Sequence, residues 1–486
     1  MNGILSIFIV LPIVSAFLIP LFNRVNRKMP DIIGNLTVFC LLASAIGIFF
    51  LFQPGFVVVY HNLVLDGLSH LLIITINLIA CMVAFYSINY MERYTGKSRY
   101  YALFMLMLAG MNGVVLAGDF ILLFIFLELA ATASSALVGF GTQAEEMEAS
   151  LKYLIMGSVA SLFILFGIAL LYGLTGAVNM ADIARILQQT DSSWPRTFII
   201  VLFLLGFGTK AAIVPFHSWL PDAHPSAPAP ISAMLSGVLI KALGVYALVR
   251  IIYNVMGMTP QVSTVLMMLG TVSMLVGVLL AIGQWDFKRL LACHSISQIG
   301  YVVLGIGIAT PIGVMGGLFH LFNHAIFKSL LFLNAGAVEY TTGTRDLRKM
   351  GGLANKMPIN AVTSLAASLS ISGIPPFNGF WSKLFIILAC VQSGKLLLAF
   401  ACAVGSLLTL ASFLKVQKYA FFDNIKVEFE NIREVPAVMW FPMVIMALLC
   451  LIMGIFFQYS ISIIINPAVQ AVARGVSYGR IVMGGL

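Results

Sequence analysis

Charged residues are scarce in this chain: of its 486 residues, only 9% are Asp, Glu, Lys or Arg. Soluble domains contain about 25% charged residues, whereas 60% of this chain is hydrophobic. A membrane-spanning helix needs about 20 predominantly apolar residues, and the chain offers about fourteen such segments. The composition therefore excludes a soluble globular protein. It predicts an all-α polytopic membrane protein with about fourteen transmembrane helices.

Short polar loops separate these predicted spans. The spans lie near residues 2–22, 31–52, 66–90, 98–117, 119–140, 150–173, 197–216, 229–253, 260–283, 291–309, 313–337, 358–391, 396–415 and 437–457. The first span has neither a charged N-terminal region nor a small-residue cleavage site, which favours a spanning helix over a signal peptide.

Cysteine is also rare, and the signatures of catalytic sites are missing. All six cysteines fall within predicted spans and none forms a CxxC pair, so packing is favoured over a metal or disulfide role. We find no glycine-rich phosphate loop, nucleophile elbow or nucleotide fingerprint. We therefore expect no cofactor, no metal and no catalytic site in this chain. Membership of a redox-driven complex, as one of its subunits, stays open.

The excess of basic residues follows the predicted topology. The net charge is +9. If the N-terminus lies outside, sixteen Lys and Arg residues, Lys288 among them, fall in cytoplasmic loops, and six, including Arg250, fall on the outer side. This asymmetry is the positive-inside pattern. It predicts a multi-pass protein of the cell inner (plasma) membrane with both termini on the outer side, in contact with the lipid bilayer and with no nucleic acid.

Three short motifs recur in the same order along the central part of the chain. The pairs are Gly118-Asp119-Phe120 with Trp285-Asp286-Phe287, residues 149–154 with 325–330, and residues 215–219 with 376–380. They predict two units of five spans each, 98–253 and 260–415. Because five is odd, the second unit enters the membrane inverted, as in many secondary transporters. Residues 1–97 form an N-terminal three-helix segment, and 416–486 a cytoplasmic loop, a last helix and a tail.

Prolines interrupt two of the predicted spans. Pro215 lies in the seventh, and Pro375 and Pro376 lie in the twelfth. Proline removes a backbone donor and frees carbonyls, which a water-filled cavity can use. We therefore predict broken helices at both places, with a simple dry kink as the alternative at each.

Ionisable residues recur inside otherwise apolar segments. They are Glu128, Lys210, Lys241, His320, His324, Lys328 and Lys383, with Lys152 at the edge of a further segment. A charge at the bilayer centre costs about 2.5–3.5 kcal/mol on insertion scales, so it is rarely kept without a use. Buried lysine can release a proton, and histidine titrates near neutral pH. The series predicts a midplane relay for protons or small cations.

Glu128 lies in the middle of its span, and we predict Lys210 as its partner. An ammonium close to a buried carboxylate keeps that carboxylate charged. A pair whose strength changes with a third charge is a switch for proton affinity. A static buried ion pair is the alternative.

His320, His324 and Lys328 follow one another at spacings of four, so they share one helical face. Two histidines at this spacing bind zinc in metallopeptidases, but that motif needs a glutamate at position 321, which is Leu. We favour a proton relay over metal binding and over plain hydrogen bonding between helices. His217 and His224 are expected to position a loop.

Several of these residues lie in recognisable motifs. The segment 215–228, PFHSWLPDAHPSAP, followed by ISAMLSG at 231–237, resembles the signature of the Mrp-type antiporter subunit family. So do KRLLA at 288–292 with SISQIGY at 295–301, and GIPPF at 373–377. The resemblance covers nearly the whole chain. The family includes antiporter-like subunits of respiratory complex I, of Mrp cation/proton antiporters and of membrane-bound hydrogenases.

The resemblance implies a role for each matching position. Glu128 and Lys210 look like the coupling pair on the fifth and seventh helices, Lys241 like the eighth-helix lysine, and Lys383 like the twelfth-helix lysine that passes the proton to the far side. One complex I subtype has glutamate there, so this chain departs from it. About 29 residues follow the last predicted span, too few for the lateral helix of the largest subunits.

The resemblance also implies partners. They are other hydrophobic subunits, H+, and the Na+ for which H+ is exchanged. The sequence His-Pro-Ser-Ala-Pro most resembles that of the D-type subunit of Mrp antiporters and of its counterpart in membrane-bound hydrogenases. A proton-pumping subunit of a complex I type enzyme is the alternative. A solute transporter, an enzyme and an inactive scaffold are the rival classes. The first needs a solute pocket, the second a convergent catalytic cluster, and the third the loss of a charged residue.

Overall fold

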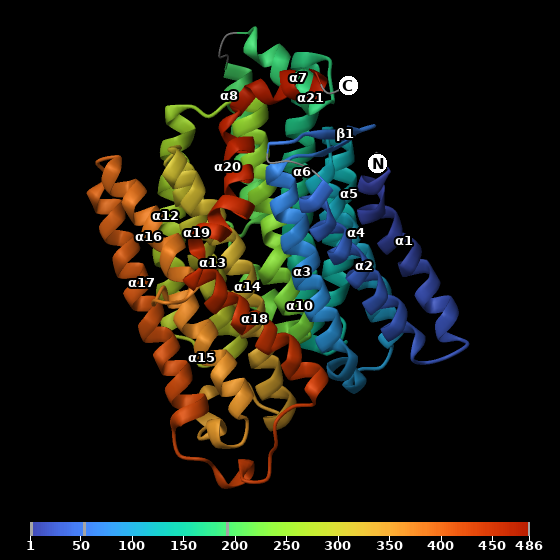
Figure 1. Cartoon of the computed structure of the whole chain (residues 1–486), viewed down its shortest axis with the longest axis vertical. Helices are drawn as coiled ribbons and strands as arrows, with labels where there is room; N and C mark the ends of the chain where they lie inside the picture. Colours follow the sequence, from blue (N-terminus) through green and yellow to red (C-terminus); the bar gives the residue numbers. More distant parts are fainter. Residues whose placement is uncertain (1–2, 52–54, 191–193, 485–486) are drawn as a thin grey trace.

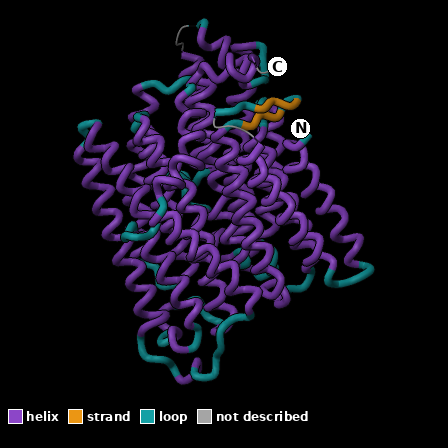
Figure 2. Tube along the Cα trace, in the orientation of Figure 1, coloured by secondary structure: helices purple, strands orange, loops and turns teal. Residues whose placement is uncertain are grey.

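The computed structural model describes residues 3–51, 55–190 and 194–484, which form a bundle of long helices (Figures 1 and 2). Twelve of the described helices are long and apolar enough to cross a membrane. The strands among these residues make one antiparallel hairpin, β1 (Val58–Tyr60) with β2 (Leu63–Leu65), in which Val59 faces Val64. The prediction of an all-helical membrane protein is confirmed.

The first half of the chain contains the N-terminal helices and the first predicted five-span unit. The helices are α1 (Ile4–Asn23), α2 (Met29–Leu51), α3 (Gly67–Tyr90), α4 (Lys97–Leu116), α5 (Phe120–Val138), α6 (Ala144–Thr175), α7 (Met180–Gln188), α8 (Trp194–Lys210), α9 (Leu220–Ser226) and α10 (Ala229–Met234). Helix α10 continues through π-helical turns and α11 (Ala247–Val249) to Met256. One helical path of 28 residues, Ala229–Met256, results.

The second half contains the second predicted unit and the C-terminal segment. Its helices are α12 (Pro260–Ile282), α13 (Phe287–Gly307), α14 (Pro311–Thr342), α15 (Pro358–Ser372), α16 (Asn378–Gln392), α17 (Leu396–Val416), α18 (Ala437–Ile455), α19 (Phe457–Ser460), α20 (Asn466–Ala473) and α21 (Tyr478–Gly484). Many helices begin at the expected caps. Asp66, Asp119 and Asp286, for example, each accept a hydrogen bond from a backbone N–H of the following turn.

The twelve long helices fall short of the predicted fourteen spans at the two places where proline was expected to break a helix. Helix α8 has 17 residues and ends at Lys210, before Pro215. The predicted span 358–391 is divided into α15 and α16, of 15 residues each. A helix turn cannot continue where proline removes the N–H donor, so both segments are shorter than a membrane-crossing helix.

The three helical paths at the centre of the bundle are the most buried. The spanning parts of Ala229–Met256, α13 and α14 are completely enclosed, whereas those of α1, α2, α6 and α17 are about one third buried. Figure 1 shows α10, α13 and α14 in the middle and α1 and α17 at the two edges. The lipid-facing helices therefore shield the central ones, which carry most of the predicted relay.

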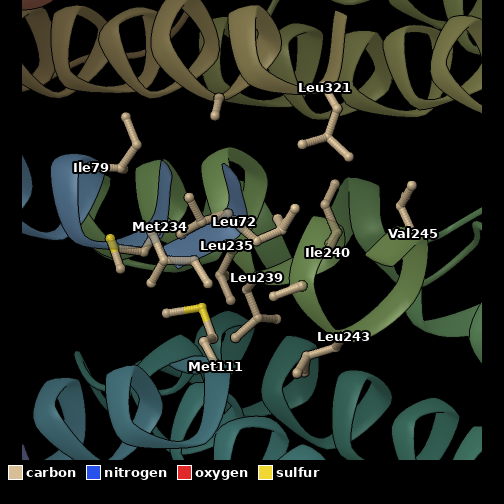
Figure 3. Close-up of a cluster of buried hydrophobic side chains, with 14 of the residues drawn as sticks. Leu72, Ile79, Met111, Met234, Leu235, Leu239, Ile240, Leu243, Val245 and Leu321 are labelled. Atoms are coloured by element: carbon tan, nitrogen blue, oxygen red, sulfur yellow. The ribbon is translucent and has the colours of Figure 1, made fainter. Parts of the chain in front are cut away.

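Apolar side chains pack closely around the first of these central paths. Figure 3 shows Leu235, Leu239 and Leu243 together with Met111 and other labelled side chains, including Leu321 above them. All of these side chains are buried. This packing keeps bulk water away from the polar groups that lie among the same helices.

The chain stays largely helical beyond the last predicted span, which α18 matches. After α18, the short helix α19, a π-helical turn (Ile461–Ile465) and α20 carry the chain on towards the end where α1 begins (Figure 1). There Asn254 donates hydrogen bonds to the carbonyls of Ala471 and Gly475 at 3.0 and 3.2 Å. The tail of about 29 residues is thus largely part of the bundle.

Two matching β-bridges lie at opposite ends of the bundle. Asp119 pairs antiparallel with Asn179, just before α7, and Asp286 pairs in the same way with Asp346. Helix α7 packs beside the C-terminal helix α21. The bridge of Asp286 with Asp346 lies at the other end of the bundle. Arg345, next to this bridge, donates to the carbonyl of Pro225, which lies just before the start of the central path at that end.

Candidate ion-translocation site

The structure brings Glu128 and Lys210 together. Lys210 Nζ lies 3.6 Å from Glu128 Oε1 in an ion pair, and Ser161 donates a hydrogen bond to the same oxygen. The Lys210 side chain is 4% exposed and the Glu128 side chain 36%. Lys210 is the last residue of α8, where the helix dipole favours a cation. The predicted pairing is confirmed by this contact, while its role in transport stays a prediction.

The break after Lys210 contains a residue whose importance the sequence did not reveal. His224, expected to position a loop, lies within α9 and is completely buried. Neither ring nitrogen has a hydrogen-bond partner among the described residues. Its ring centroid lies 5.9 Å from that of Phe332 on α14, and Lys328 Nζ lies 5.7 Å from the same Phe332 ring. His224 therefore belongs with the buried titratable groups. In the sequence, the feature that could have identified His224 was its position two residues after Asp222, at the start of the proline-rich segment.

Lys241 is held inside the central path by a backbone carbonyl of the same helical path. Its Nζ donates to the carbonyl of Ser236 at 2.6 Å. That carbonyl belongs to a π-helical turn, which interrupts the regular hydrogen-bond ladder, a feature frequent at functional sites. Gly244 packs on the backbone of Ala211, so a Cβ there would lie 2.5 Å from Ala211 N. The helix of Lys241 thus touches the residue that follows Lys210.

His320, His324 and Lys328 share one face of α14, as their spacing predicts. The two imidazole rings are nearly parallel, with centroids 6.3 Å apart. His320 contacts Gln298 Oε1 at 3.1 Å and Ser382 Oγ at 2.9 Å. His324 and Lys328 are fully buried, without hydrogen-bond partners among the residues described. Three buried titratable groups therefore follow one another along α14.

Lys383 lies beside the second helix break. Its Nζ donates to the carbonyl of Ile371 at 2.7 Å and to Ser406 Oγ at 3.3 Å. Ile371 is in the last turn of α15, where the break leaves carbonyls free, as predicted for Pro375 and Pro376. The same Nζ lies 4.7 Å from the centre of the Tyr301 ring.

Tyr301 connects Lys383 to the α14 face. Its ring centroid lies 5.5 Å from that of His320. Helix α14 also packs against the central path of Lys241, where Ser329 donates to the carbonyl of Ala233 at 3.0 Å. The predicted residues from Lys241 to Lys383 thus form one buried series. No group of three or more His, Cys, Asp or Glu side chains with metal-binding geometry occurs among the described residues.

Lys152 is not part of this series. Its side chain is about half exposed and pairs with Glu148 at 2.8 Å and Asp222 at 3.2 Å. These residues line a polar surface cavity of about 320 Å³ together with Arg289 and Arg345. This position agrees with its place at the edge of an apolar segment in the sequence, and the exposed side of α6 beyond it is apolar.

Two basic residues that were counted in the charge asymmetry are buried in ion pairs. Arg250, counted on the outer side, is buried in the central path and forms two hydrogen bonds of 2.7 Å to Asp66. Lys288, counted in a cytoplasmic loop, is buried at the start of α13, 2.8 Å from Glu339. Both helices extend beyond the predicted span limits, so residues near the ends of apolar runs are enclosed by neighbouring helices.

Comparisons with known proteins match this arrangement. Residues 117–409 match the family described as NADH:quinone oxidoreductase/Mrp antiporter, TM, and residues 52–101 match the complex I chain 5 N-terminus. The D-type subunit of the Na(+)/H(+) antiporter of Alkalihalophilus pseudofirmus is 34% identical over 96% of this chain and 98% of its own length. Hydrogenase-4 component B of Escherichia coli is 32% identical over 83% of this chain and 64% of its own.

A solved structure shows the same fold. A chain in the structure of the Mrp complex from Dietzia sp. DQ12-45-1b superimposes with a TM-score of 0.90, at 28% identity and 99% coverage of both chains. The match spans all the helices that carry the buried series.

Proposed function

This chain belongs to the NADH:quinone oxidoreductase/Mrp antiporter family of membrane subunits, and from that premise we propose that it translocates protons along its buried series. The similar named relatives favour the D-type subunit of an Mrp antiporter or its hydrogenase counterpart, in which H+ moves in exchange for Na+ or alone. A proton-pumping subunit of a complex I type enzyme is the second candidate, because the matched family includes such subunits.

The buried series is the observation that carries this proposal. Titratable side chains follow one another from Lys241, in the enclosed central path, along α14 to Lys383 on α16, and all of them are buried. Such groups are costly in a membrane, and two of them, His324 and Lys328, lack a hydrogen-bond partner within the described ranges. A solute pocket would gather polar groups around one cavity, whereas these groups extend along the bundle.

The Glu128–Lys210 pair acts as the switch at one end of the series. At about 4 Å, two unit charges interact by roughly 4 kcal/mol in a medium of effective dielectric constant 20. Glu128 holds the Lys210 ammonium at the far side from Lys241. When a third charge draws Glu128 away, the unpaired ammonium repels a proton on Lys241. That proton then moves along His324 and His320 towards Lys383.

A neighbouring subunit covers Glu128 in the assembled complex. The Glu128 side chain is 36% exposed, and Ile125 beside it is 55% exposed, so both face outwards. A carboxylate facing lipid costs several kcal/mol, whereas a polar group of another subunit would stabilise it. This position also suits the third charge that the switch requires. The solved relative is likewise part of a multi-subunit complex.

The matching bridges and helix breaks support two inverted five-helix units, 98–253 and 260–415. Both bridges follow the same pattern at opposite ends of the bundle. With α8–α9 and α15–α16 each counted as one broken span, the total is the fourteen spans proposed. The basic loops, including residues 24–28, lie at the end opposite to the start of α1 (Figure 1). The positive-inside rule makes that end cytoplasmic, with both termini outside.

Purification of the native complex through a tag on this subunit tests the host. Small hydrophobic subunits without iron–sulfur or nickel proteins identify an Mrp-type antiporter, and co-purifying redox subunits identify a hydrogenase or a complex I relative. Proton movement is then measured in everted vesicles with a pH-sensitive dye, with and without Na+. Wild-type proton movement in both the Glu128→Ala and the Lys210→Ala complex would exclude the proposed switch.

A further inference from the structure

Helix α15 carries a stripe of polar side chains on its buried side. Asn360, Ser364, Ser368 and Ser372 follow one another at spacings of four, so they lie along one slowly turning face. All four are buried. We call these four residues the α15 stripe. It starts at the end of the bundle that carries residues 423–436 and stops at the helix break.

The stripe leads to Lys383 through a single hydroxyl. Ser406 of α17 donates a hydrogen bond of 2.7 Å to the carbonyl of Ser372, the last stripe residue. Lys383 in turn donates to Ser406 Oγ at 3.3 Å. The buried amine of Lys383 therefore reaches the end of the stripe through Ser406, on a side different from Tyr301 and the α14 face.

Polar groups also face the stripe from α17 and α13. Helices α15 and α17 pack against each other, and Thr409 and Ser412 on α17 are buried. Ser412 Oγ lies 2.8 Å from His294 Nε2 on α13. His294 is fully buried, and its Nδ1 has no hydrogen-bond partner in the described part of the chain.

Gln417 is the group that points most directly to a ligand. It is buried, and its Nε2 donates to Ser364 Oγ at 3.1 Å and to Ser368 Oγ at 2.9 Å, so its amide is aimed into the stripe. Its Oε1 has no partner among the described residues, and neither does Asn360 Oδ1. An unsatisfied buried polar atom costs about 1–3 kcal/mol.

Water is the ligand that satisfies such atoms. Buried waters typically make about three hydrogen bonds to otherwise unpaired polar groups. Serine hydroxyls alone need no water, because each can bond to a carbonyl of its own helix, as Ser372 does with Ser368 O. That explanation does not extend to the unpaired atoms of Gln417, Asn360 and His294.

We propose that the α15 stripe and the facing groups of α17 line a chain of water molecules that exchanges protons between Lys383 and the end of the bundle carrying residues 423–436. Lys383, protonated through His320, gives a proton to the adjacent water, which passes one to the next water along the stripe. Charge and atoms balance, because one proton leaves the chain of water molecules for each one that Lys383 gives up. This inference rests on the proposed function, since it carries away the protons that reach Lys383.

Cysteine labelling tests the water directly and does not depend on transport. The six native cysteines are replaced, and Ser364→Cys or Ser368→Cys is introduced into the full complex in lipid nanodiscs. A small cationic methanethiosulfonate reagent should modify both, because the reactive thiolate forms in contact with water and not in apolar surroundings. Val362→Cys, on the lipid-facing side of the same helix, is the matched control. Labelling of the stripe cysteines no faster than this control overturns the proposal.

Bulky substitutions test whether the water carries protons. Ser368→Leu should slow proton movement by about tenfold, the effect of roughly 1.4 kcal/mol on a barrier. Ala366→Leu adds similar bulk on the other side of α15, at the groove it forms with α18, and should leave the rate unchanged. Gln417→Met removes the amide without adding bulk and should also slow transport. Wild-type rates in both Ser368→Leu and Gln417→Met overturn the proposal.

The experiments distinguish an error in the proposed function from an error in the proposed water chain. If Lys383→Ala stops transport while stripe cysteines stay unlabelled and Ser368→Leu is unaffected, the path along α15 is wrong and the proposed function stands. If Lys383→Ala transports normally, the proposed function is wrong. Labelling of Ser364→Cys and Ser368→Cys would then establish the water chain itself and exclude its use by Lys383.

Discussion

The two broken helices hold their lysines in different ways. Lys210 ends α8 and faces a carboxylate, Glu128, at 3.6 Å. Lys383 follows the second break and is held by a backbone carbonyl, a hydroxyl and the face of an aromatic ring. The first lysine therefore depends on a counter-ion and the second on neutral dipoles. A counter-ion can be drawn away by a third charge, whereas a set of fixed dipoles cannot.

This difference suggests a division of labour. Glu128 is partly exposed at the edge of the protein, so the pair that it forms with Lys210 is suited to sense a neighbour's charge. Lys383 is enclosed and is suited to exchange protons with the groups around it. Substitutions should therefore distinguish the two lysines.

Substitution of Lys383 should have the largest effect. Lys383→Ala and Lys383→Arg should both abolish proton movement in everted vesicles, because arginine keeps its proton permanently. Lys210→Arg should retain part of the rate, since it preserves the ion pair with Glu128. The yield of purified complex serves as the control for assembly. Equal loss in Lys210→Arg and Lys383→Arg would contradict the proposed distinction.

Removal of Glu128 should be almost as severe. Glu128→Ala should abolish transport and also destabilise the protein, because it leaves the Lys210 ammonium buried without a counter-ion. The loss should be smaller than the about 3–5 kcal/mol of a fully buried pair, since Glu128 is partly exposed. Thermal unfolding of the complex measures it. The double variant Glu128→Ala/Lys210→Ala should regain stability but not transport; recovery of transport would refute the switch.

A smaller effect is expected for the dipoles around Lys383. Ser406→Ala removes one hydrogen bond, worth about 0.5–1.5 kcal/mol, so the transport rate should fall by about two- to tenfold. Leu407→Ala, at the next position but on the exposed, lipid-facing side of the same helix, is the matched control. The same fall in both variants would show that Ser406 acts through helix packing.

The Asp66–Arg250 pair should affect stability alone. Both residues are buried and joined by two hydrogen bonds, and the guanidinium also contacts the Tyr478 ring. Arg250→Met should destabilise the protein by about 3–5 kcal/mol, because it leaves the Asp66 carboxylate unpaired. Transport per assembled complex should be unchanged. A lower rate per complex would place Arg250 in the ion path.

The lysines, the histidines of α14 and Glu128 were found from the sequence because a charged or polar residue inside an apolar run is conspicuous there. The prolines likewise predicted where α8 and α15 end. Spacing by four placed His320, His324 and Lys328 on one face, which is a property of the single helix and needs no tertiary contact.

The residues that the sequence did not reveal lie near the ends of apolar runs or among ordinary polar side chains. Lys288 was assigned to a loop because its span was predicted to begin at residue 291, whereas α13 begins at Phe287. Arg250 was counted on the outer side, and the sequence did not reveal that it is buried and paired with Asp66. His224 looked like part of a polar segment, and Gln417 was indistinguishable from a loop glutamine.

The sequence by itself determined that this chain crosses a membrane many times and where its helices break, because hydropathy, proline and helical periodicity act locally. For the same reason it revealed the ionisable side chains that lie in the middle of apolar runs. The tertiary structure decided which of those charges meet. It paired Glu128 with Lys210, brought Lys383 next to Tyr301, and aimed Gln417 into the α15 stripe. These contacts join residues far apart in the chain, so they depend on how whole helices pack, which local patterns do not encode.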